Sequence, residues 1–430
     1  MDIAIIVPKI TARLVYTLNW IFVEQLGVTY DVLTEKPADK DDYFVIHYNG
    51  DNTEGFKIPD AGLLFEKGIK HQDIGAGQWG DLLVLFAVNG NEATIPFDIF
   101  SAVFHCISRY EEYLPFTPDK HHRYPATESI LFKNNLLDRP IVDEWIFKFG
   151  ALLASYGVKI KTKQFEFLPT YDIDIAWSYK HKGLKRTLGG YIKNVAENNF
   201  PAIQERTAVL RGKNADPYFS FDFTEKLHKE NNLSPIYFIL AAEKSGPFDK
   251  HILPSQPDMK MLIKELSEKY QVGMHPSYET NNNPELFPQE QKILSAIIGK
   301  EITISRQHYI KLALPQTYRK LIELGLQQDY SMGYGTHLGF RAGTSRPFYW
   351  YDLLEEQQAS LQVFPFSFMD TTAHYELELS TELAFQKLNN IKEKLQKVGG
   401  LMVTVFHNFS LGTDKEWVGW AAAYADFIKK

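Results

Sequence analysis

The feature that most constrains the fold is a regular alternation of short apolar segments with amphipathic, helix-length stretches, from about residue 165 onward. Parallel strands need a long crossover connection, usually a helix, so this alternation predicts a parallel α/β sheet. About seven such units over some 260 residues are typical of an irregular (β/α) barrel. The predicted strands are Phe167–Tyr171, Pro235–Leu240, Val272–His275, Thr303–Ser305, Gln328–Ser331, Pro365–Met369 and Leu401–Phe406.

Helical periodicity is clearest in three of the intervening stretches, which are Asp258–Tyr270, Pro315–Leu324 and Thr381–Val398. Residues 1–165 have a different texture and predict a smaller α/β domain, beginning with a strand at Ile3–Val7 and a helix at Ala12–Gln25. A chain of 430 residues exceeds the roughly 250 to 300 residues that one core supports. We therefore expect two domains, residues 1–165 and the barrel of residues 166–430.

Composition excludes several classes of partner and site. The net charge is −7 with both signs interspersed, so no basic block is available to follow nucleic-acid phosphates. The single cysteine, Cys106, excludes an internal disulfide framework and a multi-cysteine zinc cluster. A metal in this chain would therefore be held by histidines and carboxylates.

The apolar segments are short, and none approaches the ~20 residues needed to span a bilayer. The chain starts Met-Asp-Ile-Ala, with no basic leader before its first apolar run. The expectation is a cytoplasmic protein without a transmembrane segment.

Polar residues that bear chemistry stand at the ends of several predicted strands, where barrels of this type place their reactive groups. They are Asp172, Asp174, His275, His308, Asp370 and His407. Taken singly, each has a structural reading, such as an Asx turn for the aspartates or a hydrogen-bonded core position for a histidine. Their recurrence at separate strand ends favours a common reactive centre.

The segment 170–174, Thr-Tyr-Asp-Ile-Asp, resembles the first motif of the polysaccharide deacetylases, carbohydrate esterase family four. The resemblance covers roughly residues 165 to 415. It also includes the segments Ser-Arg-Gln-His and Phe-Arg-Ala-Gly-Thr of a subgroup that carries an extra N-terminal α/β domain. By this likeness Asp172 is the general base and Asp174 a metal ligand.

The second family motif is His-Ser/Thr-x-x-His, with both histidines on the metal. Here His275 matches the first position, but Glu279 occupies the second. The third ligand is therefore either Glu279 or His308. We favour His308, because it restores the His₂Asp set used by zinc sites. The implied cofactor is a divalent metal, with zinc favoured.

The remaining motifs assign roles by resemblance. Asp370 resembles the carboxylate that orients the catalytic histidine. His407 resembles that histidine, which acts as general acid. Arg341 resembles the arginine that pairs with the base Asp172, and Arg346 is the alternative.

Four aromatic residues adjoin these motifs. They either stack on sugar rings of the substrate or belong to the barrel core. They are Trp177, Tyr278, Tyr349 and Trp350.

The resemblance implies a hydrolase acting on carbon–nitrogen bonds other than peptide bonds. Its substrate would be an N-acetylated or O-acetylated sugar or polysaccharide, from which it removes an acetyl group. Two alternatives stay open: hydrolysis of a non-sugar C–N bond on the same barrel, and an inactive barrel that only binds a glycan or a partner. The role of residues 1–165 and the oligomeric state are not indicated by the sequence.

Overall fold

The largest element of the structure is a curled parallel sheet covered by helices. In a computed structural model, the chain is described over residues 2–35, 43–48, 55–88 and 93–429. Within these residues the sheet has nine strands in the order β12-β13-β11-β10-β9-β8-β7-β15-β14. All neighbouring strands run parallel except the pair β12 and β13. The strands are β7 (Glu166–Ile173), β8 (Ile236–Leu240), β9 (Gln271–His275), β10 (Ile304–Ser305), β11 (Gln328–Met332), β12 (Phe348–Asp352), β13 (Gln357–Pro365), β14 (Phe368–Met369) and β15 (Leu401–His407).

The prediction of an α/β fold built on an irregular (β/α) barrel is confirmed. β12 and β14 are the two edges of the sheet, so the barrel is open. The antiparallel hairpin β12–β13 was not predicted. The prediction relied on strands that alternate with helices, and no helix separates the apolar segment 348–352 from the strand that follows it.

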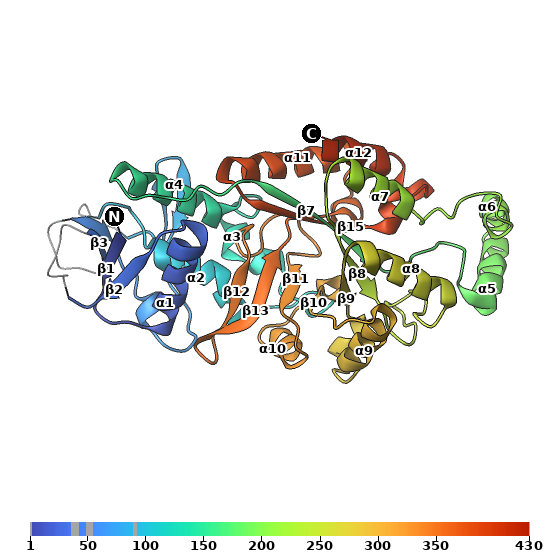
Figure 1. Ribbon diagram of the computed structural model, residues 1–430, viewed down its shortest axis with the longest axis horizontal. Helices are drawn as coiled ribbons and strands as arrows, with labels where there is room; N and C mark the ends of the chain where they lie inside the picture. Colours follow the sequence, from blue (N-terminus) through green and yellow to red (C-terminus); the bar gives the residue numbers. More distant parts are fainter. Residues whose placement is uncertain (1, 36–42, 49–54, 89–92, 430) are drawn as a thin grey trace.

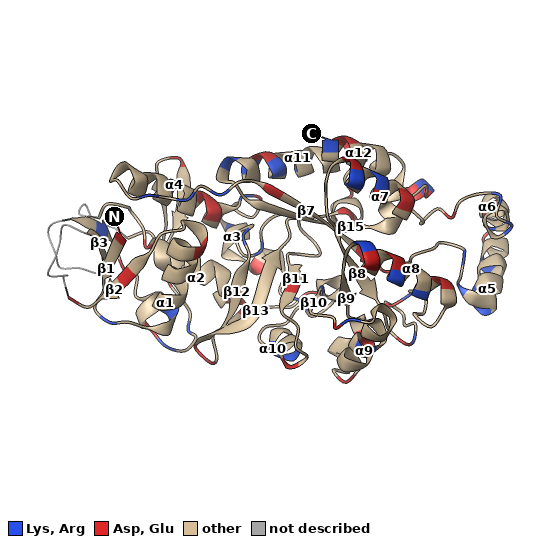
Figure 2. Ribbon diagram, in the orientation of Figure 1, with Lys and Arg blue, Asp and Glu red and all other residues tan. Residues whose placement is uncertain are grey.

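The crossover helices pack around the sheet (Figure 1). The three expected helices are confirmed within two residues at each end, as α8, α10 and α11. The α-helices of this part are α5 (Gly183–Ala196), α6 (Phe200–Leu210), α7 (Phe221–Glu230), α8 (Pro257–Lys269), α9 (Leu286–Ile298), α10 (Gln316–Glu323), α11 (Thr381–Val398) and α12 (Trp420–Lys429). Lys, Arg, Asp and Glu are distributed along α8, α11 and α12 (Figure 2). No helix in the described ranges combines the length and apolar character needed to cross a bilayer.

Helix α11 shows how the sequence sets these elements. Ser380 caps its N-terminus by accepting the backbone N–H of Leu383, and Gly399 ends it with a positive φ of 62°. Its buried residues recur every three or four positions, so one apolar face packs on the sheet. They are Ala384, Phe385, Leu388, Ile391 and Leu395.

The described residues between 2 and 155 form a second, smaller α/β unit with a parallel sheet in the order β2-β1-β3-β4. Its strand β1 is short and buried on both sides, and the helices lie against this sheet (Figure 1). The elements are β1 (Asp2–Ile6), α1 (Ala12–Leu18), a π-helical segment (Asn19–Gln25), β2 (Tyr30–Leu33), β3 (Tyr43–Tyr48), β4 (Phe56–Ile58), β5 (Ala76–Trp79), β6 (Leu82–Leu85), α2 (Ile99–Ile107), α3 (Ile130–Lys133) and α4 (Ile141–Ser155).

A buried ion-pair network joins the two units. Arg341, which follows β11, donates from Nε and Nη2 to the Glu112 carboxylate at 2.8 and 2.6 Å. Arg109 donates to the same carboxylate at 2.8 Å. Burial alone would raise the pKa of Glu112, but the two guanidinium groups outweigh it and lower that pKa. The network therefore fixes the smaller unit against the barrel.

Removing one member of this network should destabilise the fold. Arg341→Met leaves the buried Glu112 carboxylate with one of its two guanidinium partners, so we expect a loss of about 3 kcal/mol in the free energy of unfolding. Urea denaturation measures it. The matched control is Lys133→Met, which removes an exposed pair with Glu128 and should cost less than about 1 kcal/mol. Equal losses in the two variants would show that the network does not stabilise the fold.

Candidate active site

The carboxyl ends of neighbouring strands bring the predicted residues together. Asp172 lies near the end of β7, directly opposite His407 of β15 in the strand register. Asp174 is two residues further, on the same side of the extended chain. β9 ends on His275, and the segment after the two-residue strand β10 carries His308. Residues from four strand ends therefore meet at one edge of the sheet.

Asp174, His275 and His308 form a compact cluster. The Nε2 atoms of His275 and His308 lie 3.3 and 3.5 Å from the carboxylate oxygens of Asp174. One ligand atom from each residue lies within 4.8 Å of the others. Asp174 Oδ1 is buried without a hydrogen-bond partner in the described part of the chain. Two imidazoles and one carboxylate, of which one oxygen has no hydrogen-bond partner, fit the ligand set of a divalent cation such as zinc.

The charge of Asp174 is compensated by its neighbours. Burial alone would raise the pKa of this carboxyl group. The imidazoles of His308, His275 and His407 outweigh that effect and lower the pKa well below its usual range. The neighbouring imidazoles thus favour the anionic form of this carboxyl group.

A second layer of contacts orients the two imidazoles. The Nδ1 atom of His275 lies 2.6 Å from the backbone oxygen of Arg306, and that of His308 lies 2.9 Å from Asp249 Oδ1. Each contact assigns the proton to Nδ1 and leaves Nε2 as the atom that faces Asp174. Asp249 was missed in the sequence because it lies nine residues beyond the end of β8, in a loop.

The third position of the cluster is taken by His308 and not by Glu279. Glu279 is exposed, and its carboxylate accepts a hydrogen bond from Asn282 at 3.3 Å. It is not part of the cluster. Of the two alternatives that the sequence left open, the geometry favours His308.

Asp172 is paired with an arginine that the sequence did not indicate. Arg306 Nη1 donates to Asp172 Oδ1 at 2.8 Å, and its Nε donates to the backbone oxygen of Tyr330. The guanidinium lies 4.4 Å from the ring centroid of Phe238 and is fully buried. It is therefore held in one position by contacts on several sides. The sequence feature that could have indicated this role is the position of Arg306 directly after a strand, two residues before His308.

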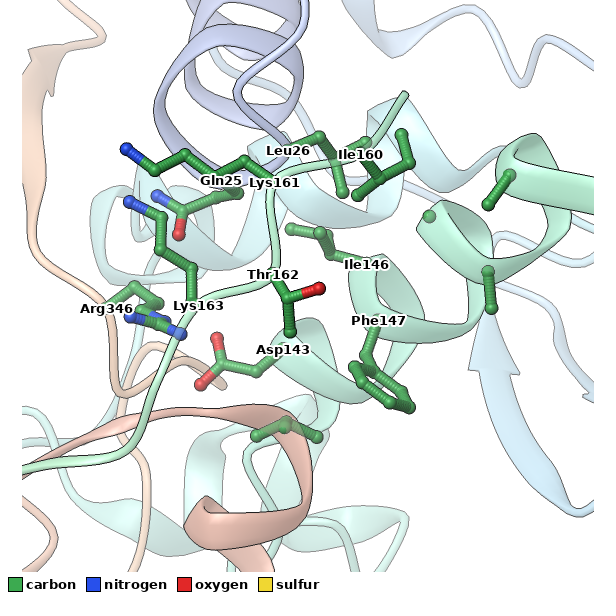
Figure 3. A pocket seen from close by; sticks show the side chains of 14 residues that line it. Gln25, Leu26, Asp143, Ile146, Phe147, Ile160, Lys161, Thr162, Lys163 and Arg346 are labelled. Carbon is green, nitrogen blue, oxygen red and sulfur yellow. The ribbon is translucent and has the colours of Figure 1, made fainter. Parts of the chain in front are cut away.

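The prediction that Arg341 pairs with Asp172 is wrong, and so is the alternative with Arg346. The segment that carries both arginines turns toward the smaller unit, so Arg341 binds Glu112. Arg346 donates to the backbone oxygen of Gly399. Figure 3 shows Arg346 with Lys163 and Asp143 around a separate cavity of about 260 Å³. That cavity shares no lining residue with the one that contains Asp172.

His407 and Asp370 form the expected contact. Asp370 accepts the backbone N–H of His407 at 2.7 Å, and its other oxygen lies 2.7 Å from Nδ1. Burial alone would lower the pKa of His407, but the charges of Asp370 and Asp174 outweigh it and raise that pKa to about 9. The imidazole therefore carries a proton at neutral pH, with Nε2 lying 3.6 Å from Asp174.

A cavity of about 390 Å³ opens onto these groups. The smaller N-terminal unit forms part of its wall through Lys120, His121 and Arg123, a contribution that the sequence did not indicate. Gln307 lies in the cavity wall with both amide atoms buried and unpaired among the described residues. The lining includes Asp172, Asp174, His275, His308 and His407, together with Lys120, His121, Arg123, Phe248, Tyr309, Tyr375 and Phe409.

None of the four aromatic residues proposed as sugar platforms lines this cavity. Trp177 is buried and stacks on Phe219, with ring centroids 5.9 Å apart. Trp350 is also buried, and the backbone oxygen of Tyr349 accepts a hydrogen bond from Tyr16. Tyr278 lines a neighbouring cavity. Their positions agree with the core alternative for the two tryptophans, and other rings face the cavity.

Comparison with known proteins gives a family match over the smaller unit. Residues 3–157 match a family of unknown function, DUF7033. No curated protein matches the chain.

Three solved structures resemble the chain at low identity. A protein assigned as a polysaccharide deacetylase from Mycobacterium smegmatis is 13% identical, with a TM-score of 0.40, over 63% of this chain and 84% of its own. The polysaccharide deacetylase Bc1974 from Bacillus cereus is 11% identical, with a TM-score of 0.30, over 62% and 88%. PuuE allantoinase is 12% identical, with a TM-score of 0.39, over 62% and 83%. These values are too low for any of the three to indicate a function for this chain.

Metal content should separate the two candidate third ligands. His308→Ala removes one of the two imidazoles that face Asp174, so the purified variant should lose its metal. Glu279→Ala removes an exposed carboxylate and should retain one equivalent per chain. Elemental analysis after dialysis measures both. Loss of metal in the Glu279 variant alone would reverse the assignment.

Proposed function

We propose that the chain is a divalent-metal-dependent hydrolase that removes an acetyl group from an N-acetylated or O-acetylated sugar or polysaccharide. The observation that carries this proposal is the layout of one cavity. The Asp174, His275 and His308 cluster lies between a carboxylate held by an arginine and a protonated histidine held by a carboxylate. Hydrolysis of an amide or ester needs a base for water and an acid for the leaving group, and these two pairs supply them. The likeness of the strand-end motifs to those of polysaccharide deacetylases supports the choice of an acetylated sugar.

Asp174, His275 and His308 are the residues proposed to hold the metal, with zinc favoured by the His₂Asp set. A bound divalent cation would supply Lewis acidity and make water more acidic at this position.

Asp172 is the proposed general base. Arg306 occupies its Oδ1, so Oδ2 is the atom left to take a proton from water. The buried guanidinium pairs with the carboxylate and fixes its direction. Because Arg306 is itself held by a backbone oxygen and an aromatic face, the base is positioned before substrate binds.

His407 is the proposed general acid. Its Nδ1 is engaged by Asp370, so the proton on Nε2 is the one available to the departing nitrogen or oxygen. With its pKa raised to about 9, the group is charged and ready to donate at neutral pH. Asp370 also fixes the backbone of the same residue, so the ring and its strand are oriented together.

Gln307 is proposed to bind the acetamide group. Its Nε2 and Oε1 are both buried and unpaired among the described residues, at the wall of the cavity. A primary amide presents a donor and an acceptor together, which complement the carbonyl and the N–H of an acetamide. An unpaired buried polar group is costly unless a ligand satisfies it.

Residues 1–165 are proposed as a separate domain that completes the cavity. Lys120, His121 and Arg123 reach the cavity wall. Arg123 is held by Asp119 through an N–H···O bond of 2.8 Å, so this part of the wall is ordered. The smaller unit then has a role in enclosing the substrate, beyond its contacts with the barrel.

Acetate release from a panel of substrates tests the proposed reaction. The panel contains N-acetylglucosamine oligomers, an O-acetylated xylan, a simple acetamide and a cyclic imide. Asp172→Asn and His407→Ala should each lower kcat by about 10² to 10⁴ while metal stays bound, as expected for general acid–base residues. Glu279→Gln is the control and should keep full activity. Turnover of the simple amide or the imide without any acetate from the sugars would contradict the sugar assignment.

A second comparison tests the arginine that positions the base. Arg306→Gln removes the charge beside Asp172, so kcat should fall by about 10²-fold with little change in KM, because the base loses its orientation. Arg346→Gln removes a similar charge near the separate cavity of Figure 3 and should leave kcat unchanged. Loss of activity in the Arg346 variant with full activity in the Arg306 variant would contradict the assignment.

A further inference from the structure

A helical hairpin extends away from the sheet at the far end of the molecule (Figure 1). It consists of α5 (Gly183–Ala196) and α6 (Phe200–Leu210) and follows β7 in the chain. The buried residues of these helices are Asn194 and Val209. The hairpin is therefore exposed over most of its surface.

α5 presents an unpartnered apolar stripe. Leu184, Leu188, Ile192 and Val195 are 77%, 52%, 71% and 57% exposed. With about 100° between successive residues, these four positions fall within an arc of about 80° on one side of the helix. Large apolar side chains gathered in this way mark a surface that is covered by something else.

The stripe does not face α6. α5 meets α6 through Tyr191, whose hydroxyl lies 2.9 Å from the Thr207 hydroxyl. The Arg206 guanidinium lies over the Tyr191 ring at 5.5 Å and would meet a side chain at Gly190 within 2.6 Å. At about 100° per residue, Gly190 and the buried Asn194 lie on another side of α5 from the stripe, and Tyr191 lies at the border between the two. The interface within the hairpin is thus polar and aromatic, and the apolar side of α5 remains open.

The hairpin and the residues that flank it form a basic segment, in contrast to the chain as a whole. Between Tyr179 and Lys213 there are eight Lys and Arg residues and two Glu residues, a net charge of +6 in a chain of net charge −7. Both helices carry Lys or Arg (Figure 2). The basic residues are Lys180, Lys182, Lys185, Arg186, Lys193, Arg206, Arg211 and Lys213.

We propose that this hairpin is a docking element that lies on the surface of an anionic lipid bilayer. An exposed apolar stripe flanked by Lys and Arg is the pattern of helices that lie in the plane of a membrane interface. The stripe would enter the boundary between headgroups and acyl chains, while Lys185 and Lys193 meet the phosphates. The net charge of +6 on the segment from Tyr179 to Lys213, which contains the hairpin, favours an anionic surface over an uncharged apolar partner.

The position of the hairpin connects the membrane surface to the cavity. The hairpin follows the carboxyl end of β7, the edge of the sheet at which the cavity opens. Arg186 donates to the backbone oxygens of His251 and Lys250 at 2.6 and 3.0 Å. The same loop carries Asp249, which orients His308. Docking by α5 would therefore place the edge of the sheet that bears the cavity close to the lipid. The docking proposal does not depend on the reaction proposed above.

Sedimentation of the full chain with vesicles tests the proposal. The chain should pellet with vesicles of phosphatidylglycerol and phosphatidylcholine in equal amounts, and at least tenfold less with phosphatidylcholine alone. The triple variant Leu184→Ser, Leu188→Ser, Ile192→Ser should lose at least tenfold in binding, and so should Lys185→Glu with Lys193→Glu. The controls Leu383→Ser and Lys387→Glu make the same kinds of change on exposed positions of α11 and should bind as the unaltered chain does. Circular dichroism melts establish that each variant is folded.

Two results would overturn the proposal. One is a folded chain that does not bind the anionic vesicles, or that binds them equally well after the changes on α5. The other is a dimer in light scattering that the triple serine variant converts to a monomer, without vesicle binding by either form. That result would assign the stripe to a contact between two copies of the chain.

Discussion

The candidate site depends on one partly buried carboxylate, Asp174, surrounded by three imidazole rings. The Nε2 atoms of His275, His308 and His407 lie 3.3, 3.5 and 3.6 Å from its oxygens. A carboxylate in such a place costs several kcal/mol in lost hydration unless neighbours compensate it. The compensation comes from separate strands, so the charge at the centre exists only when the whole edge of the sheet is assembled.

Strand order determines which groups meet around that carboxylate. β7 supplies Asp172, and the residue directly after this strand is Asp174. β9 and the segment after β10 supply the two histidines of the cluster, and β15 supplies His407. Asp370 follows β14, the neighbour of β15, and so it reaches the imidazole of His407. Partners outside the cavity then orient each group. The pairing of every charged group with a fixed neighbour is what gives the site a base, an acid and a cluster that can hold a cation.

Much of this arrangement could be predicted from sequence, because one rule of parallel sheets locates reactive groups at strand ends. That rule selected Asp172, Asp174, His275, His308 and His407, which line one cavity. It failed for contacts made over long distances in the chain. Arg341 binds Glu112 across 229 positions, and nothing local to either residue indicates that pairing.

Two further features were out of reach for physical reasons. Asp249 lies in a loop, where no periodicity fixes the direction of its side chain. Lys120, His121 and Arg123 meet the cavity only through the packing of one unit on the other. The aromatic residues next to the motifs were proposed as sugar platforms, but an aromatic side chain suits a core as well as a sugar site. The apolar stripe of α5 differs from these features, because its spacing is visible in the sequence. Only the structure shows that none of the described residues covers it.

The most direct test of the central claim is a crystal structure of the chain grown with zinc, with anomalous data collected on either side of the zinc absorption edge. We expect a single strong peak within about 2.0 to 2.2 Å of the Nε2 atoms of His275 and His308 and of an Asp174 oxygen. A peak bound by Glu279, or no peak at this cluster under saturating zinc, would contradict it.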